Sequence, residues 1–378
     1  MSALPNHRTG RVGDRRGSRL LVRGLHLDIP LLIGLILLAF IGLVILYSAS
    51  GQDTDMLIRQ ILRLFLAFGV MIVLAQIPPH YLEYWAPWLF GIGLALLLAV
   101  LLVGEIGKGA QRWLDVGLFR FQPSEIMKLA VPLMIAWYLA ENPLPPTKLQ
   151  LVYTLLIIFV PALLIAKQPD LGTAVLIAGS GVFVLLLAGT RWKYFLIAVA
   201  GAAACAPALW YFMRDYQRAR LLTFLDPERD PLGTGYHIIQ SKIAIGSGGL
   251  YGKGWLNGTQ SHLEFLPERT TDFIFAVFGE EFGFIGIVLL MALYLFIVVR
   301  GLYIATQAHD TFTRLVAGSL ILTFFVYTFV NIGMVTGLLP VVGLPLPLIS
   351  YGGTSMVTVL AGFGIVMSIH THRKLLPS

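Results

Sequence analysis

The sequence predicts an all-α polytopic membrane protein with about ten transmembrane helices. Of its 378 residues, 57% are hydrophobic and only 12% carry charge, whereas roughly 25% are charged in a typical soluble domain. Apolar runs recur along the chain at roughly the 20 residues that a helix needs to cross the hydrocarbon layer. In water, so few charged residues could not cover so much apolar surface. In a bilayer the apolar surface faces lipid and does not need to be covered.

The candidate spans follow one another from the end of the N-terminal tail to the C-terminus. They are 29–48, 57–76, 81–103, 123–140, 151–166, 172–188, 192–211, 272–299, 314–337 and 349–369. The pair 151–166 and 172–188 has a second interpretation as one broken helix, since both are short and only five residues separate them. A single broken helix would move the C-terminus to the other side of the membrane.

The distribution of lysine and arginine favours cytoplasmic termini. With the N-terminus inside, the short inner segments hold twelve Lys and Arg residues and the short outer segments hold four. This bias predicts an N-in, C-in chain with an even number of spans and one long extracytoplasmic loop at about 212–271. We expect residues 1–24 to be a disordered basic cytoplasmic tail and 25–378 to be a single membrane domain. The basic tail precedes a span and no basic domain follows, which excludes nucleic acid as a partner.

Two outward-facing segments carry unusual polarity near the membrane edge. Glu125 and Lys128 lie one helical turn apart at the start of a span, where ionisable side chains usually face the protein interior and mark a site. The alternative is a structural ion pair. Asp170 follows Lys167, Gln168 and Pro169 in the short turn between two spans, and it either caps the next helix or belongs to a site.

The long loop and its exit form the third polar segment. Its glycine-rich part at 246–258 hints at a phosphate-binding loop around Lys253, but the required glycine and Ser/Thr positions are not matched. Asp272 opens the following span, where it could be a helix cap or, with Arg269 nearby, an ionised base. Glu280 lies ~12 Å further along the helix, a depth at which a carboxylate must be paired, protonated or facing a cavity.

A fourth segment, 331–353, contains three prolines and cannot be one continuous helix. Irregular backbone at membrane depth persists only where it is buried in protein or lines a wet cavity. Together the four segments predict one polar cavity at the outer face. The lone Cys205 and the pair His370 and His372 lack converging ligands, so the sequence predicts no metal site.

At these segments the chain resembles the SEDS family (shape, elongation, division and sporulation). The strings that carry the resemblance are GKGAQRWLDVG and FQPSEIMK at 107–128, KQPDLGT at 167–173, DPLGTGYHIIQSKIAIGSGGLYGKGW at 230–255, FLPERTTDFIFAVFGEEFG at 265–283, and NIGMVTGLLPVVGLPLPLISYGG at 331–353. The last string and the ending IHTHRK resemble elongation-type members more than division-type members.

The resemblance implies a peptidoglycan glycosyltransferase that polymerises lipid II at the outer face of the bacterial cytoplasmic (inner) membrane during elongation. It implies a class B penicillin-binding protein as transpeptidase partner, and a divalent cation, Mg or Mn, as a cofactor. The family's essential aspartate matches Asp272. Other motif positions of the family match Arg112, Trp113, Glu125 and Lys128, and the resemblance implies that they contact the substrate. Asp170, Arg269 and Glu280 of the polar segments are further candidates for substrate contact.

Three alternatives remain open at this point. A lipid II flippase would also need many spans and intramembrane carboxylates, although it would need access to both faces in turn. A division-type paralogue would share the chemistry and differ in the process that it serves. A non-catalytic scaffold protein would give Asp272 and Glu280 no functional role.

Overall fold

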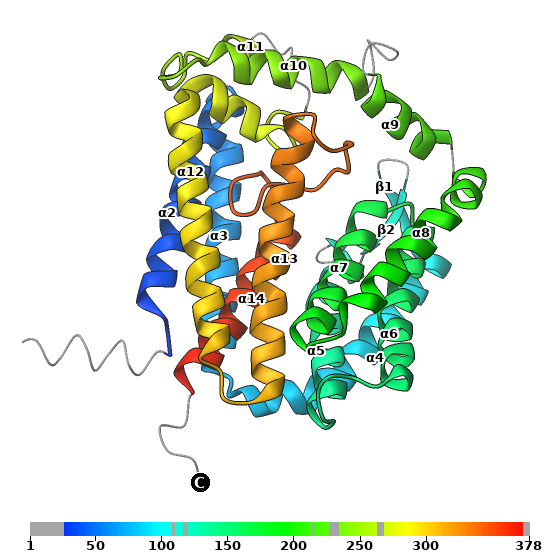
Figure 1. The fold of residues 1–378 in the computed structure, drawn as a ribbon. Coiled ribbons are helices and arrows are strands. Elements are labelled where there is room, and N and C mark those ends of the chain that lie inside the picture. The colour runs from blue at the N-terminus through cyan, green and yellow to red at the C-terminus, as the bar shows by residue number, and fades with distance from the viewer. Residues whose placement is uncertain are drawn as a thin grey trace, which may run out of the picture.

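The computed structural model describes residues 26–107, 110–115, 120–213, 215–226, 234–262 and 268–372, so the N-terminal tail lies outside the described residues. Ten helices of 17 residues or more are found among them (Figure 1). They are α2 (Ile29–Ala49), α3 (Thr54–Gln76), α4 (Pro79–Val103), α5 (Pro123–Ala140), α6 (Lys148–Lys167), α7 (Leu171–Leu187), α8 (Trp192–Phe212), α12 (Ile274–Thr306), α13 (Thr311–Val335) and α14 (Thr354–Thr371). The prediction of ten helices is confirmed.

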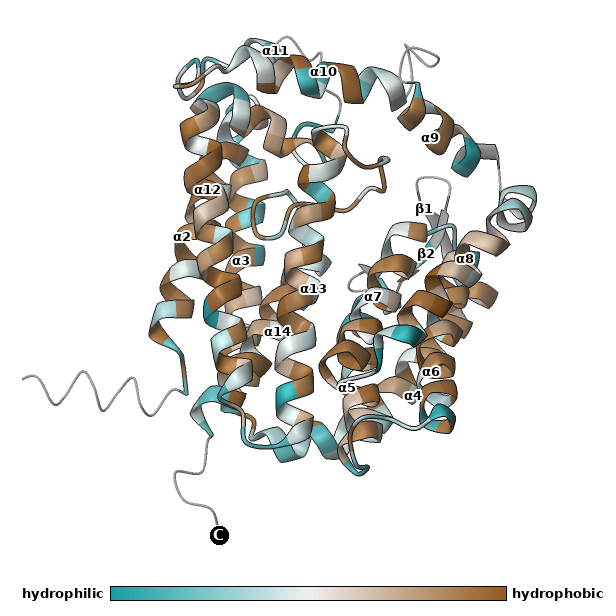
Figure 2. Ribbon diagram, in the orientation of Figure 1, coloured by the Kyte–Doolittle hydropathy of each residue, from teal (hydrophilic) through white to brown (hydrophobic). Residues whose placement is uncertain are grey.

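Seven of the ten are both long and apolar enough to cross a membrane. The helices α7 and α8 add shorter apolar stretches, and α5 carries Glu125 and Lys128 in its first turns. Figure 2 shows hydrophobic colour along the middle of the helices and hydrophilic colour gathered at their two ends. This banding is that of a multi-pass membrane protein.

The helix boundaries follow from local capping. Asp53 accepts a hydrogen bond from the Met56 amide at the start of α3, and Thr147 forms a capping box with Gln150 at the start of α6. Asp170 caps α7 by accepting from the Thr173 amide at 3.2 Å. The cap begins a new helix, and α6 and α7 pack against each other. They are therefore two neighbouring helices, and the interpretation as one broken helix is wrong.

The helices form two groups that meet along α13. The first group is α2, α3, α12, α13 and α14, and the second is α4 to α8 (Figure 1). Helix α13 packs on both α5 and α7 of the second group. It is buried over most of its length, so it lies at the interface between the two helix groups.

A small sheet and three short helices lie at one end of the bundle. The sheet has the order β1 (Glu105–Gly107), β2 (Ala110–Asp115) and β3 (Arg120–Phe121). The helices are α9 (Asp215–Leu225), α10 (Thr234–Ser247) and α11 (Thr259–His262), which run across the top of the bundle in Figure 1. The sequence had predicted no strand here, because polar residues between two spans carry no alternating apolar pattern.

The glycine-rich stretch is explained by close packing rather than phosphate binding. Helix α12 is broken at Gly283, whose φ is 65°. The carbonyls of Glu280 and Glu281 leave the helix ladder there and accept hydrogen bonds from the amides of Lys253 and Gly254, each at 3.0 Å. A Cβ at Gly252 would collide with the Glu281 carbonyl. Only glycine allows this approach.

The other end of the bundle is fastened by Asp28, the N-cap of α2. Its carboxylate accepts hydrogen bonds from Arg300 of α12 at 2.6 and 3.1 Å, and His370 of α14 lies 3.2 Å away. Burial opposes ionisation of Asp28, but its hydrogen bonds to His370, Arg300 and the Leu31 amide outweigh burial and hold its pKa well below the usual range. His370 therefore lies against a carboxylate at this end of the bundle.

Candidate functional site

A loop between α13 and α14, residues 336–353, holds the turn that carries Asp272. Asn331 is fully buried, and its amide donates to the carbonyl of Asp272 at 3.0 Å and to that of Leu344 at 2.7 Å. Ser350 donates to the Thr271 carbonyl at 2.6 Å. The backbone around Asp272 is thus fixed by Asn331 of α13 on one side and by the 336–353 loop on the other.

The Asp272 side chain is half-buried and lies beside the same loop. A Cβ at Gly343 would stand 3.5 Å from its Oδ2 atom, so glycine lets the loop pass close to the carboxylate. The interpretation of Asp272 as a helix cap is wrong, because α12 begins at Ile274 and Phe273 occupies the cap position without a side-chain bond. The carboxylate is therefore placed by tertiary contacts and not by helix capping.

Arg112 and Asp170 meet between β2 and the start of α7. The Arg112 guanidinium donates to the carbonyls of Gln168, at 3.3 Å, and Pro169, and it lies 3.7 Å from the Asp170 carboxylate. Gln122 donates to the same carboxylate at 3.2 Å. Asp170 thus caps α7, as one of the two alternatives predicted, and also contacts Arg112. Its role in a site stays a prediction.

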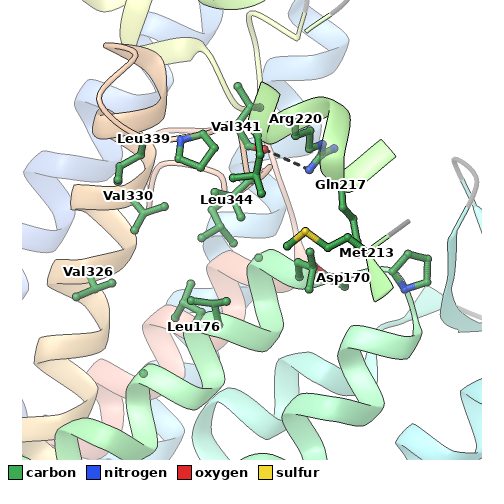
Figure 3. A pocket seen from close by; sticks show the side chains of 18 of the residues that line it. Asp170, Leu176, Met213, Gln217, Arg220, Val326, Val330, Leu339, Val341 and Leu344 are labelled. Atoms are coloured by element: carbon green, nitrogen blue, oxygen red, sulfur yellow. Dashed lines mark hydrogen bonds between the residues drawn. The ribbon is translucent and has the colours of Figure 1, made fainter. Parts of the chain in front are cut away.

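Arg112 and Asp170 line a cavity of about 450 Å³ between α7, α9 and α13, which we call the α7–α13 cavity. Figure 3 shows its walls: α7 contributes Leu176, α13 contributes Val326 and Val330, and the 336–353 loop contributes Val341 and Leu344. Arg220 of α9 lies at its rim and donates to the Val341 carbonyl at 3.3 Å (Figure 3). Arginines at one end and aliphatic walls at the other suit an anion with a lipid chain.

Glu125 and Lys128 form a buried ion pair on α5. The Lys128 ammonium lies 2.8 Å from the Glu125 carboxylate and donates to the Tyr327 hydroxyl of α13 at 3.4 Å. Tyr327 in turn shares a hydrogen bond of 2.9 Å with Ser355 at the start of α14. The pair therefore connects α5, α13 and α14.

A second cavity, of about 680 Å³, opens between α3, α5 and α14, and we call it the α3–α14 cavity. Trp113 and Glu125 line it, together with Arg63 of α3. Arg112 and Trp113 are adjacent on β2 and successive strand residues point to opposite faces. The β2 strand therefore presents one predicted site residue to each cavity.

Glu280 and Arg269, like Asp272 and Lys128, lie outside the lining of these two cavities. Glu280 is fully buried and accepts from Lys253 at 2.7 Å, from Thr259 at 3.0 Å and from the Gln260 amide at 3.1 and 3.2 Å. These bonds fasten the 246–260 loop, so a substrate contact of Glu280 would require them to break and stays a prediction. Arg269 is half-buried next to the α2–α3 turn at Gly51.

Sequence reasoning missed three residues of this region. Arg63 carried a usable signal, since it is an arginine inside the predicted span 57–76. Arg220 and Tyr327 carried none, because one lies in a loop with several arginines and the other in an apolar helix. The tertiary fold places Arg220 beside Val341 and Tyr327 beside Lys128.

The helices, the banded hydropathy and the two cavities define a polytopic α-helical membrane protein. The sequence model of the FtsW/RodA/SpoVE family, described as "Cell cycle protein", matches residues 29–375. The chain belongs to this family, as its motifs indicated.

Several relatives are similar over nearly the whole chain. Peptidoglycan glycosyltransferase MrdB of Escherichia coli K12 is 58% identical, with 93% of this chain and 95% of that protein covered. Stage V sporulation protein E of Bacillus subtilis is 36% identical over 92% and 98%.

Solved structures are similar as well. A chain described under "Structural coordination of polymerization and crosslinking by a peptidoglycan synthase complex" has a TM-score of 0.81 and 34% identity, covering 92% of this chain and 99% of that one. The rod shape determining protein RodA of Thermus thermophilus has a TM-score of 0.70 and 28% identity, covering 92% and 98%.

Proposed function

We propose that this protein is a peptidoglycan glycosyltransferase that polymerises lipid II into glycan strands during cell elongation. The proposal places it in the bacterial cytoplasmic (inner) membrane, with the Asp272 face toward the periplasm. The 58% identity to MrdB supports the elongation-type assignment, compared with 38% to a probable FtsW of Geobacter metallireducens.

One observation carries the proposal most directly. The loop segment 339–344 lines the α7–α13 cavity, and Gly343 of that segment lies against the Asp272 carboxylate. A potential base is thus separated by one loop from a cavity with arginines and aliphatic walls. A lipid-linked sugar diphosphate offers the matching groups, an apolar chain, an anion and a hydroxyl.

The reaction would join two lipid-linked glycans. The 4-hydroxyl of an incoming lipid II attacks the anomeric carbon of the growing chain, and undecaprenyl pyrophosphate leaves. The α-linked donor gives a β-linked product, so one direct displacement suffices and no covalent enzyme intermediate forms. Asp272 takes the hydroxyl proton as general base, and Arg112 stabilises the charge of the departing pyrophosphate.

A divalent cation stays a prediction from family resemblance. Among the residues that the structure describes, no group of three or more His, Cys, Asp or Glu side chains could hold a metal ion. Chelation by EDTA, followed by addition of Mg²⁺ or Mn²⁺, tests the prediction, and it requires that polymerisation stop and then return.

The proposed partner is a class B penicillin-binding protein that crosslinks the new strands. Its support is the structural similarity to a chain of a complex described as coordinating polymerisation and crosslinking. Co-purification of the two full-length membrane proteins in detergent, followed by analysis of crosslinked product, tests this part. Product that is polymerised but not crosslinked would contradict it.

Polymerisation in detergent separates the glycosyltransferase from the flippase. Flipping needs a closed bilayer, whereas polymerisation does not. We expect the detergent-solubilised protein with its partner to convert lipid II into glycan strands that are resolved on a gel. Absence of strands, together with lipid II movement across sealed vesicles, would contradict the proposed function.

A further inference from the structure

The turn of residues 270–272, which carries Asp272, lies just before α12. Each of its three carbonyls accepts a hydrogen bond from a residue far along the chain. The first accepts from the Tyr351 amide at 2.8 Å, the second from the Ser350 hydroxyl at 2.6 Å and the third from the Asn331 side-chain amide at 3.0 Å. Three consecutive carbonyls are thus held by tertiary contacts.

These bonds take the place of helical bonds that the local sequence would allow. Residues 268–273 contain neither proline nor glycine, the two residues that strongly oppose a helix interior, yet α12 begins only at Ile274. In a longer helix the same carbonyls would accept from amides four residues further on. The tertiary partners therefore set the conformation of the turn, and with it the direction in which the Asp272 side chain leaves the backbone.

Asn331 enters this contact at a cost to the fold. It is fully buried, and its amide group also donates to the Leu344 carbonyl at 2.7 Å. Its Oδ1 atom is buried and accepts no hydrogen bond from the residues that the structure describes. A buried acceptor without a partner is destabilising, so an apolar residue would serve packing alone better. The contribution of Asn331 is its pair of donors, which tie the 270–272 turn to the 336–353 loop.

Ser350 holds the turn from the other side, and the loop around it is itself fixed. Its hydroxyl accepts from a backbone amide of the loop at 2.7 Å, and its carbonyl accepts from Gln60 of α3 at 3.3 Å. Tyr294 of α12 donates to the Pro347 carbonyl at 2.7 Å. All three side chains are buried. The loop is therefore a support anchored on two helices, against which the 270–272 turn is bonded.

A rigid support matters for a group that must meet a hydroxyl at a fixed place. A misplacement of about 1 Å can lower the rate of a reaction about a hundredfold. Bonds to the backbone of the turn leave the Asp272 carboxylate oxygens free of these three partners while fixing the point from which the side chain extends. This is the arrangement expected for the placement of a base.

We propose that Asn331 and Ser350 are positioning residues for the glycosyl transfer. They hold the backbone of the 270–272 turn so that the Asp272 carboxylate stands where the acceptor hydroxyl is presented, and they do not touch the substrate themselves. The inference rests on the proposed function, because it takes Asp272 as the base.

Steady-state kinetics of lipid II polymerisation, with the full-length protein and its partner in detergent, test the inference. We expect Ser350→Ala and Asn331→Ala to lower kcat by about 10- to 100-fold and to leave KM for lipid II unchanged, because both act through Asp272. Ser319→Ala is the matched control, since Ser319 of α13 is fully buried and donates to the Ser180 carbonyl at 2.7 Å. It should lower the unfolding temperature but keep the wild-type kcat.

Two results would overturn the inference. One is a kcat for the two variants equal to that of Ser319→Ala, which would make the bonds structural only. The other is a raised KM with an unchanged kcat, which would place the residues in contact with the substrate. Either Ser350→Ala or Asn331→Ala decides alone if the other does not fold. A wild-type protein that makes no glycan strands would instead contradict the proposed function, so the two failures are distinguishable.

Discussion

Lys128 and Glu125 depend on each other because both are almost fully buried. Removal of one partner leaves the other charge uncompensated, at a cost of about 3–5 kcal/mol. We therefore expect Lys128→Met to lower the free energy of unfolding by this amount and the double variant Glu125→Gln/Lys128→Met to recover most of the loss. Thermal unfolding in detergent measures both. If the loss of stability in the double variant equals the sum of the losses in Lys128→Met and Glu125→Gln, the ion pair is not the source of the stability.

The same double variant separates the structural and functional interpretations of the pair. Recovered stability with normal glycan synthesis would make it a structural ion pair. Recovered stability with lost synthesis would make it part of the site. The sequence could place Glu125 and Lys128 one turn apart on one helix, but Tyr327 lies about 200 residues away along the chain, and no local pattern reveals such a partner.

The contacts that hold Arg112 lead to a second prediction. Arg112 is held by two carbonyls and by Asp170, so its guanidinium is pre-positioned for an anion. We expect Arg112→Met to lower the rate of lipid II polymerisation about a hundredfold, the usual effect of removing one stabilising donor. Asp170→Asn keeps the helix cap and removes the charge, so its effect should be smaller. Equal losses in both variants would contradict this order.

At the scale of elements, the contact between the 246–260 loop and the break in α12 depends on glycine. A Cβ at Gly252, whose φ is +80°, would strike the Glu281 carbonyl, and overpacking of this kind costs about 1–3 kcal/mol or more. We expect Gly252→Ala to lower the unfolding temperature and to make the loop more sensitive to limited proteolysis. Gly246→Ala is the matched control, because nothing lies within 4 Å of its Cβ position. Identical behaviour of the two variants would exclude the packing explanation.

The elements themselves show where sequence reasoning succeeds. All ten predicted spans correspond to observed helices, because a bilayer-spanning helix must be apolar over about 20 residues. The position of the break at Gly283 was not predicted, since its cause is a distant loop that bonds to Glu280 and Glu281. The depth argument required Glu280 to be paired, protonated or facing a cavity. The structure shows it paired with Lys253, which spacing alone could not identify.

At the scale of the whole molecule, the orientation of the bundle can be measured. The proposed orientation puts Tyr251, which is exposed on the 246–260 loop, on the periplasmic side and His309, in the α12–α13 connection, on the cytoplasmic side. In a Cys205→Ser background, a membrane-impermeant maleimide should label Tyr251→Cys in intact cells. His309→Cys should react only after the cells are opened. The opposite labelling pattern would show the reverse orientation in the membrane and would contradict the proposed function.

The end of the bundle that carries Asp28 adds a pH dependence. Asp28 joins α2 to α12 and α14, and its lowered pKa means that its stabilising charge is present above the ordinary carboxylate pKa of ~3.9 and is lost as the pH falls through the lower folded-state value. We expect Asp28→Asn to reduce stability at pH 7 by about 1–3 kcal/mol, the cost of an unpaired buried group. The difference from the wild type should shrink in strong acid. A constant difference at all pH values would contradict the assignment.

The central claim is that the Asp272 carboxylate is the base of a glycan-polymerising site. Its most direct test is polymerisation of purified lipid II by Asp272→Asn with the partner, in detergent, beside Asp310→Asn, which changes an exposed carboxylate at the start of α13. We predict that Asp272→Asn folds normally and makes no glycan strands, whereas Asp310→Asn makes them at the wild-type rate. Strands of near-normal yield from Asp272→Asn would contradict the claim.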